Sequence, residues 1–150
     1  MNQPLKIAIA GLGTVGGGTL KLLRKHAALL EHRCGRAIVV SAVSARDRAK
    51  DRGVPVDGIR WFDDPLAMAA DADVDVVVEL IGGEDGIAKE LCEAAIANGK
   101  HVVTANKALI AHHGTALAHS SEAAGVPRLR GRGGRRHPHR QDVVRGARRQ

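Results

Sequence analysis

The sequence has very few aromatic residues and cysteines. Its 150 residues include one tryptophan, one phenylalanine, no tyrosine and two cysteines. Trp61 and Phe62 alone cannot build an aromatic platform on which nucleic-acid bases stack. Cys34 and Cys92 are far apart, form no Cys-x-x-Cys pattern and have no histidine at ligand spacing, which argues against a disulfide framework and a zinc site. We therefore expect no bound metal and a reducing, cytoplasmic environment.

Long hydrophobic runs and export signals are also missing. The N-terminal segment MNQPLKIAIAG has one short apolar run that leads directly into glycines. It lacks a basic region followed by a small-residue cleavage site, and the run is too short to span a bilayer. The sequence thus predicts neither export nor membrane insertion.

The positive charge of the chain is confined to its last residues. Residues 1–126 contain 14 Lys and Arg against 15 Asp and Glu, which gives −1, whereas residues 127–150 contain nine Arg and one acid, which gives +8. A segment with few apolar residues and a high net charge cannot bury enough surface to fold. We expect one folded domain over residues 1–126 and a disordered basic tail over residues 127–150.

Within residues 1–126, apolar segments of strand length alternate with longer segments of helical period. Strands are expected at residues 5–11, 37–43, 59–62, 74–83 and 100–106, and helices at residues 14–32, 63–70, 85–99 and 107–125. The apolar side of the first helix is expected to include Val15, Leu22, Leu23, Ala27 and Leu30. The alternation predicts an α/β fold of the Rossmann type, in which helices cover both faces of a doubly wound parallel sheet.

Three glycines form a G-x-G-x-x-G motif where the first strand leads into the first helix. They are Gly11, Gly13 and Gly16. In such a motif the first glycine permits a tight turn, the second lets the backbone approach a pyrophosphate, and the third allows the helix to pack closely on the strand. The N-terminus of the helix adds unpaired N–H groups for the phosphates. The motif predicts a dinucleotide-binding site, and a glycine-rich turn without a ligand is the alternative.

The end of the second strand indicates which dinucleotide is bound. An acid at this place bonds the ribose 2′-hydroxyl, whereas a cation accepts a 2′-phosphate. Ser44 occupies the place of the acid, Arg46 follows it, and Arg48 and Lys50 come just beyond. This favours NADP over NAD. Asp47 leaves two alternatives open: it could bond the ribose or pair with Arg46. A third is that Arg46 is a solvated loop residue.

Two further strands end in residues that suit the reacting end of a cofactor. Ligands of such sheets bind beyond the carboxyl ends of the strands. Gly82, in the segment LIGG, would let the nicotinamide side lie against the backbone. Lys107 falls in the first turn of a helix, where the dipole disfavours a cation by about 0.3–1 kcal/mol. A bound anion or a polarised carbonyl would offset this cost, and a lysine that reaches solvent is the alternative.

Taken together, four segments resemble the nucleotide-binding region of homoserine dehydrogenases. They are IAGLGTVGGG, SAVSARD, VVVELIGG and GKHVVTANKALIAHHG, and the resemblance runs from about Leu5 to Val126. It implies an NAD(P)-dependent oxidoreductase that interconverts L-homoserine and L-aspartate 4-semialdehyde, on the pathway to threonine, methionine and isoleucine. It also implies that the full-length enzyme acts on small molecules and forms a homo-oligomer.

The resemblance implies roles for individual residues at the phosphate and adenosine end of the cofactor. Gly13, Thr14 and Val15 would hold the pyrophosphate. Ser44 and Arg46 would meet the adenosine ribose or its phosphate.

At the other end, Ile81 and Gly82 would contact the cofactor further along, and Thr104 and Lys107 would lie beside the nicotinamide and the substrate. In the family, the lysine at the position of Lys107 assists proton movement at the reacting oxygen. The hydride itself belongs to the cofactor.

After Val126 the sequence departs from the family pattern, which continues with an acid-bearing strand, a glycine-rich GGxPI turn and a substrate domain. The stretch HPHRQD is compatible with a shifted reading frame, because the codons CAT CCC CAT CGT CAA GAC give IPIVKT when they are read one base later. We therefore expect residues 127–150 to be an out-of-frame tail and the substrate domain to be absent from this chain.

This interpretation has two consequences and two alternatives. The loss of the next strand would leave the sheet with an exposed edge, and the chain would be inactive by itself. The alternatives are a stand-alone dinucleotide-binding module and a nucleic-acid binder whose nine tail arginines contact phosphates.

Overall fold

The computed structural model describes residues 3–50, 53–71, 73–82, 86–126 and 129–131. Its strands are β1 (Leu5–Ala10), β2 (Ile38–Ser44), β3 (Arg60–Phe62), β4 (Val76–Glu79), β5 (His101–Thr104) and β6 (Leu129–Gly131). Its helices are α1 (Thr14–Lys25), α2 (Ala27–Cys34), α3 (Pro65–Asp71), α4 (Ile87–Ala97) and α5 (Lys107–Ala123).

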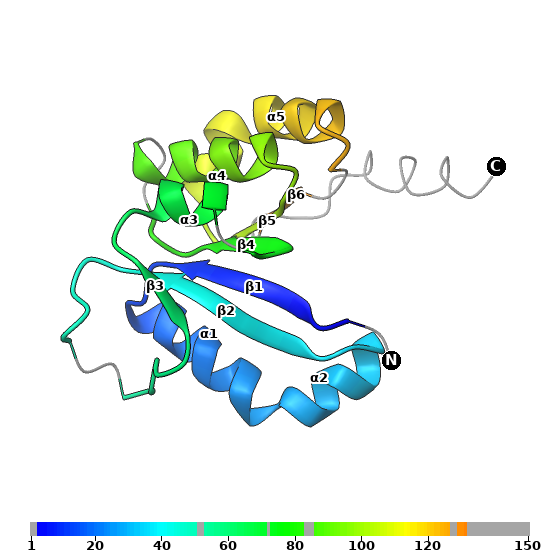
Figure 1. Cartoon of the computed structure of the whole chain (residues 1–150). Helices are drawn as coiled ribbons and strands as arrows, with labels where there is room; N and C mark the ends of the chain where they lie inside the picture. Colours follow the sequence, from blue (N-terminus) through cyan, green and yellow to red (C-terminus); the bar gives the residue numbers. More distant parts are fainter. Residues whose placement is uncertain (1–2, 51–52, 72, 83–85, 127–128, 132–150) are drawn as a thin grey trace.

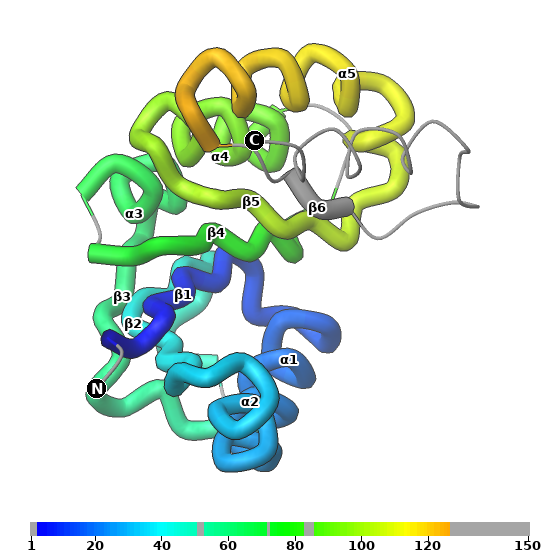
Figure 2. The backbone as a smooth tube through the Cα atoms, turned by 90° about the vertical axis from the view of Figure 1, so that its right-hand side faces the viewer, coloured from blue at the N-terminus to red at the C-terminus, as the bar shows by residue number. Residues whose placement is uncertain are grey.

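The strands form one parallel sheet in the order β3-β2-β1-β4-β5-β6. Helices α1 and α2 cover one face, and α3, α4 and α5 cover the other (Figures 1 and 2). The predicted doubly wound parallel sheet is confirmed. Because β1 is flanked by β2 on one side and β4 on the other, the strand order reverses between β1 and β4, where such sheets bind their ligands.

The two faces of the sheet bury separate apolar clusters. Successive side chains of a strand point to opposite faces. In β1, Ile7 and Ile9 pack with Leu20 of α1, whereas Ala8 and Ala10 belong to the cluster formed with α3, α4 and α5. Full burial of a residue such as Leu20 contributes about 1.5–3 kcal/mol to stability. The two clusters therefore stabilise the packing of helices on both faces of the sheet.

The helix expected over residues 14–32 is divided into α1 and α2. The division lies at His26, where φ is −107° and ψ is 21°. Hydrogen bonds continue across it, because the His26 N–H donates to the Leu22 carbonyl (3.1 Å) and the His26 carbonyl accepts from the Leu30 N–H (2.9 Å). No glycine or proline marks this bend in the sequence. After the bend, α2 contacts β2 but buries none of its residues.

The buried side of α1 also differs from the prediction. Val15 and Leu22 are each 58% exposed, whereas Leu20 is fully buried and Leu23 is half-buried. The buried residues of α1 are Gly16, Gly17 and Leu20, and Leu23 continues the face of Gly16 and Leu20, because residues three and four positions apart share one face of a helix. Close packing at Gly16 therefore decides which side of α1 faces the sheet.

Strand β6 lies within the segment that the sequence analysis assigns to the tail. Leu129 pairs with Val102 and Gly131 with Thr104, so β6 covers the edge of β5 that was expected to be exposed. The free N–H and C=O groups of an edge strand pair with any extended backbone, whatever its side-chain charge. The folded part thus reaches Gly131. The predictions of disorder, a shifted frame and nucleic-acid binding concern residues that otherwise lie outside the described part of the chain.

Candidate cofactor site

The turn between β1 and α1 has the geometry that its three glycines predict. Gly11 has a φ of +93°, and a Cβ there would lie 2.7 Å from the Leu80 carbonyl oxygen. A Cβ at Gly16 would lie 1.8 Å from the Gly11 carbonyl oxygen, while a Cβ at Gly13 would meet nothing within 4 Å. The first and third glycines therefore serve the fold, and the second leaves open space for a ligand.

Helix α1 begins at this open space with its first-turn N–H groups uncapped by any side chain. Its N-cap is Gly13, and its first turn contains no acidic residue. The N-cap of α5 differs, because the Asn106 side chain accepts a hydrogen bond from the Leu109 N–H (3.0 Å). The first-turn N–H groups of a helix attract phosphates. The exposed Thr14 and Val15 thus lie where a pyrophosphate fits.

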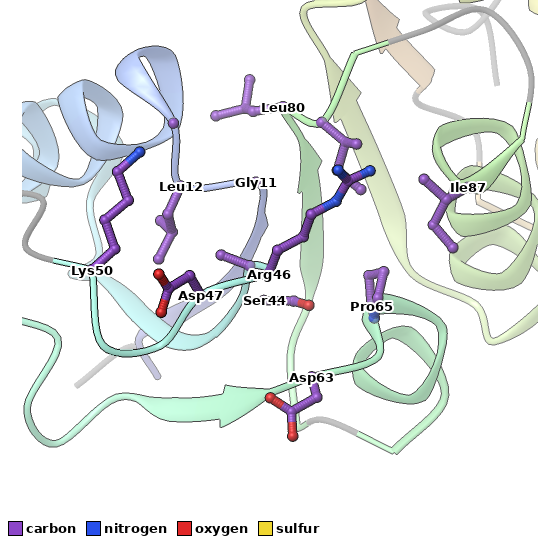
Figure 3. Close-up of a pocket in the computed structure, with 13 residues that line it drawn as sticks. Gly11, Leu12, Ser44, Arg46, Asp47, Lys50, Asp63, Pro65, Leu80 and Ile87 are labelled. Atoms are coloured by element: carbon purple, nitrogen blue, oxygen red, sulfur yellow. The ribbon is translucent and has the colours of Figure 1, made fainter.

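A pocket of about 660 Å³ opens next to the glycine turn, beyond the carboxyl ends of the strands (Figure 3). It is lined by the glycine turn and its neighbours, by the end of β2 with the loop that follows, and by residues from α3, α4 and the ends of β3 and β4. In chain order these are Gly11, Leu12, Gly13, Ser44, Ala45, Arg46, Asp47, Lys50, Asp63, Pro65, Leu80, Ile81 and Ile87. The pocket coincides with the reversal of strand order, where dinucleotides bind in sheets of this topology.

Arg46 gives this pocket a guanidinium group. Ser44, which ends β2, is buried, and its carbonyl accepts a hydrogen bond from the Gly11 N–H (2.8 Å). The exposed Arg46 extends its side chain across the pocket toward the side on which Ile87 lies (Figure 3). The strand end therefore places a small polar residue at the back of the pocket and a cation across it.

The other charged residues of the loop after β2 have different surroundings. Asp47 lines the pocket, and its carboxylate accepts from the Ala49 N–H (3.0 Å), as in an Asx turn. Lys50 also lines the pocket, from the side of α1 (Figure 3). The Arg48 guanidinium instead lies 5.8 Å from the ring centre of Trp61. Arg46 and Lys50 are thus the cations of this loop that line the pocket.

The predicted site residues divide into two groups. Those that line the pocket are Gly11, Gly13, Ser44, Arg46 and Ile81. Those that do not line it are Thr14, Val15 and Gly16 in the first turn of α1, Gly82 after β4, Thr104 at the end of β5, and Lys107 at the start of α5. Lys107 is exposed.

Sequence reasoning missed the apolar wall of the pocket. Pro65 and Ile87, which begin α3 and α4, line it together with Leu80. These residues are far from the glycine motif in the sequence, and only the sheet topology brings them beside it. No local pattern would have found them.

Sequence reasoning also missed Glu79, a fully buried carboxylate at the end of β4. Its Oε1 accepts hydrogen bonds from the N–H groups of Ile81 (2.7 Å) and Gly82 (3.1 Å). Its Oε2 accepts from the Thr104 hydroxyl (2.6 Å). The signal available in the sequence was a single acid at the end of the apolar run VVVE, since a charge is buried only where it is paired or hydrogen-bonded.

Cys92 of α4 is a core residue. Its side chain is fully buried, and burial raises the pKa of the thiol to about 12, with further contributions from the charges of Glu79 and Glu93. Such a thiol forms no thiolate near neutral pH, and the thiolate is the reactive form. Cys92 is therefore part of the apolar core between α4 and the sheet.

Among the described residues, no group of three His, Cys, Asp or Glu side chains is arranged to hold a metal ion. None of their helices is long and apolar enough to cross a membrane.

The sequence profile of the family described as homoserine dehydrogenase, NAD binding domain, matches residues 11–129. The chain belongs to the homoserine dehydrogenase family. It is 46% identical over 126 residues to the homoserine dehydrogenase of Pseudomonas aeruginosa, which covers 83% of this chain and 28% of that protein. It is 41% identical over 121 residues to the homoserine dehydrogenase of Corynebacterium glutamicum, which covers 80% of this chain and 26% of that protein.

Solved structures of the family have the same fold. A homoserine dehydrogenase from Thiobacillus denitrificans has a TM-score of 0.74 and 43% identity, covering 81% of this chain and 28% of that chain. The S. aureus homoserine dehydrogenase has a TM-score of 0.77 and 32% identity, covering 87% of this chain and 32% of that chain. The chain therefore spans less than a third of these relatives, and that third is the domain that binds a nicotinamide dinucleotide.

Proposed function

We propose that this chain is the cofactor domain of a homoserine dehydrogenase that interconverts L-homoserine and L-aspartate 4-semialdehyde, with NADP(H) preferred over NAD(H). The enzyme would be a cytoplasmic homo-oligomer of amino-acid biosynthesis. The observation that carries the proposal is the pocket of about 660 Å³ joined to an open glycine turn, in a chain whose family is shown over residues 11–129.

The charges of the pocket support NADP as the preferred cofactor. Arg46 and Lys50 line it, and the position at the end of β2 where an acid would bond a ribose hydroxyl is occupied by Ser44. A guanidinium binds phosphate through paired, charge-assisted hydrogen bonds. A serine adds no repulsion to a 2′-phosphate. Asp47 and Asp63 also line the pocket, and the bond of Asp47 to the Ala49 N–H occupies part of its acceptor capacity.

Lys107 is the residue that we expect to act on the substrate. It is the first residue of α5, at the same edge of the sheet as the pocket, and the cofactor donates or accepts the hydride. The ammonium group would hold a proton at the reacting oxygen of the semialdehyde. Developing negative charge on that oxygen would also offset the unfavourable position of a cation at a helix N-terminus.

Turnover also requires the part of the longer protein that holds the substrate. Placing a substrate carbon against a nicotinamide accounts for up to about 7–11 kcal/mol of a barrier. Lys107 is exposed within the described chain, which supports a substrate domain that covers it in the full-length enzyme.

A chimera tests this function. Residues 1–126 are joined to the downstream part of the Pseudomonas aeruginosa relative, and NADPH oxidation is followed with aspartate semialdehyde. We expect turnover by the chimera and none by a polypeptide of these 150 residues. Turnover by the shorter polypeptide would contradict the assignment of the chemistry to the substrate domain.

In the same chimera, Lys107→Ala should lower kcat by about 10²–10⁴, the usual contribution of a positioned acid or base, and leave NADPH affinity unchanged. Lys89→Ala is the matched control, because Lys89 lies on α4 in an ion pair with Glu93 (2.7 Å). An unchanged kcat in Lys107→Ala would remove this lysine from the mechanism.

A further inference from the structure

A chain of hydrogen bonds runs from Glu79 to the helix that carries Lys107. The Thr104 hydroxyl donates to Glu79, and its oxygen accepts from the N–H of Asn106 (3.0 Å). The Asn106 side chain in turn accepts from the Leu109 N–H and caps α5. The ends of β4 and β5 and the first turn of α5 are thus linked through side chains.

On its other oxygen, Glu79 holds the turn that closes the cofactor pocket. Ile81, whose N–H donates to Oε1, lines that pocket. The same turn lies against the glycine motif, because the Leu80 N–H donates to the Ala10 carbonyl (2.8 Å) and the Leu80 carbonyl lies beside Gly11. A shift of this turn would therefore change the wall of the pocket.

The direction of these bonds calls for a carboxylate at position 79. Two N–H groups and one hydroxyl donate to it. The Thr104 hydroxyl therefore accepts from Asn106 and donates to Glu79. A carboxylate accepts at both oxygens, whereas the amide of glutamine accepts at one atom and donates at the other. With its amide oxygen on the Ile81 and Gly82 N–H groups, glutamine would turn its NH2 group toward Thr104, and the Thr104 proton would lose its acceptor.

We propose that Glu79 is a positioning residue of the cofactor site, which fixes the turn after β4 and, through Thr104 and Asn106, the start of α5. One carboxylate thereby keeps the pocket wall and Lys107 in a single relative arrangement. Glu79 does not itself line the described pocket, so it acts through other residues. The inference rests on the proposed function, because it assumes that the cofactor passes from the pocket toward Lys107.

Glu79→Gln in the 150-residue chain tests the inference by calorimetric titration with two ligands. NADPH spans the whole site, whereas 2′,5′-ADP carries only the adenosine half and meets the side of Ser44 and Arg46. We expect NADPH affinity to fall about tenfold, the effect of losing one hydrogen bond to a charged group. The affinity for 2′,5′-ADP should change by less than about twofold, within the usual effect of a distant substitution.

Three further variants make the test specific. Glu93→Gln is the matched control, because it makes the same chemical change at an exposed carboxylate of α4 and should alter neither affinity. Thr104→Val should reproduce the loss of NADPH affinity, and it carries the test if Glu79→Gln does not fold. Thr104→Ser keeps the hydroxyl and should restore most of that affinity.

The inference can also be tested without a ligand, by the rate of hydrogen exchange at the Asn106 N–H, which donates to Thr104. This rate should increase in Glu79→Gln, although Asn106 follows β5 and Glu79 ends β4. Equal losses of both ligands together with a lower unfolding temperature would overturn the inference, because Glu79 would then serve only the stability of the fold. Unchanged NADPH affinity would overturn it as well. If the wild-type chain binds neither ligand, the proposed function fails first and the inference falls with it.

Discussion

The site has two sides that are built in opposite ways. On the β2 side, exposed residues of one loop, including Arg46 and Lys50, border an open pocket. On the β4–β5 side, the polar groups are turned inward, where Glu79 and Thr104 are fully buried and bonded to each other, while Lys107 stands outside them. On the proposed function, we expect the adenosine half of the cofactor to meet the exposed groups of the β2 side and the reacting half to lie over the buried network of the β4–β5 side.

The largest expected effect is at the glycine turn, which both sides share. Gly16→Ala places a Cβ 1.8 Å from a backbone oxygen, and such overpacking against backbone should cost about 3 kcal/mol of the free energy of unfolding. Gly13→Ala is the control, because nothing lies within 4 Å of its added Cβ. It should cost less than about 1 kcal/mol but weaken NADPH binding by blocking the phosphate position. Denaturant unfolding and calorimetry separate the two variants, and equal stabilities would refute this division of roles.

The next effect concerns the β2 side alone. Arg46→Ala should weaken NADPH binding about 10- to 100-fold, since a hydrogen bond to a charged group contributes about 1.5–3 kcal/mol. NADH binding should stay the same. Arg48→Ala is the matched control, because the Arg48 guanidinium lies over Trp61. Equal weakening of both cofactors would show that Arg46 does not read the 2′-phosphate.

A smaller effect is expected at the outer edge of the β5 side. Removal of residues 127–150 deletes β6 and leaves the edge of β5 unpaired, which favours association between chains. Removal of residues 132–150 keeps β6 and should leave the chain monomeric. Sedimentation at several concentrations distinguishes the two truncated chains, and identical behaviour would show that β6 does not protect this edge.

The smallest effect is expected away from both sides, at the exposed pair of Lys6 and Asp73. The hydrogen bond from Lys6, followed by its charge, lowers the pKa of Asp73. A carboxyl group whose pKa is lowered by folding stabilises the fold at pH values above its pKa in the unfolded chain. This contribution is lost as the pH falls through its pKa in the folded chain. Asp73→Asn should therefore reduce stability slightly at pH 7, as exposed pairs contribute little. The difference should shrink as the pH falls below the ordinary pKa of 3.8 and vanish below the lowered pKa of Asp73, and NADPH affinity should not change. A difference that persists in acid would refute the pairing.

Most strands and helices, and the glycine turn after β1, could be predicted from the sequence. Alternating apolar segments predict the parallel sheet because burial on both faces requires apolar strands. The motif at Gly11, Gly13 and Gly16 predicts the turn because its steric demands act between neighbours in the chain. Ser44 and Arg46 could be predicted for the same reason. They lie two residues apart at the end of β2, and both line the pocket.

Only the tertiary structure decided the features that depend on residues far apart in the sequence. The bend at His26 has no glycine or proline to announce it in the sequence. The apolar wall needs the starts of α3 and α4, with Pro65 and Ile87, to lie together on one face of the sheet. The network of Glu79 needs β4 and β5 to be neighbours with Glu79 opposite Thr104. Sequence patterns report what each segment prefers, whereas the partners of a buried carboxylate are set by strand order and register, which exist only once the chain has folded.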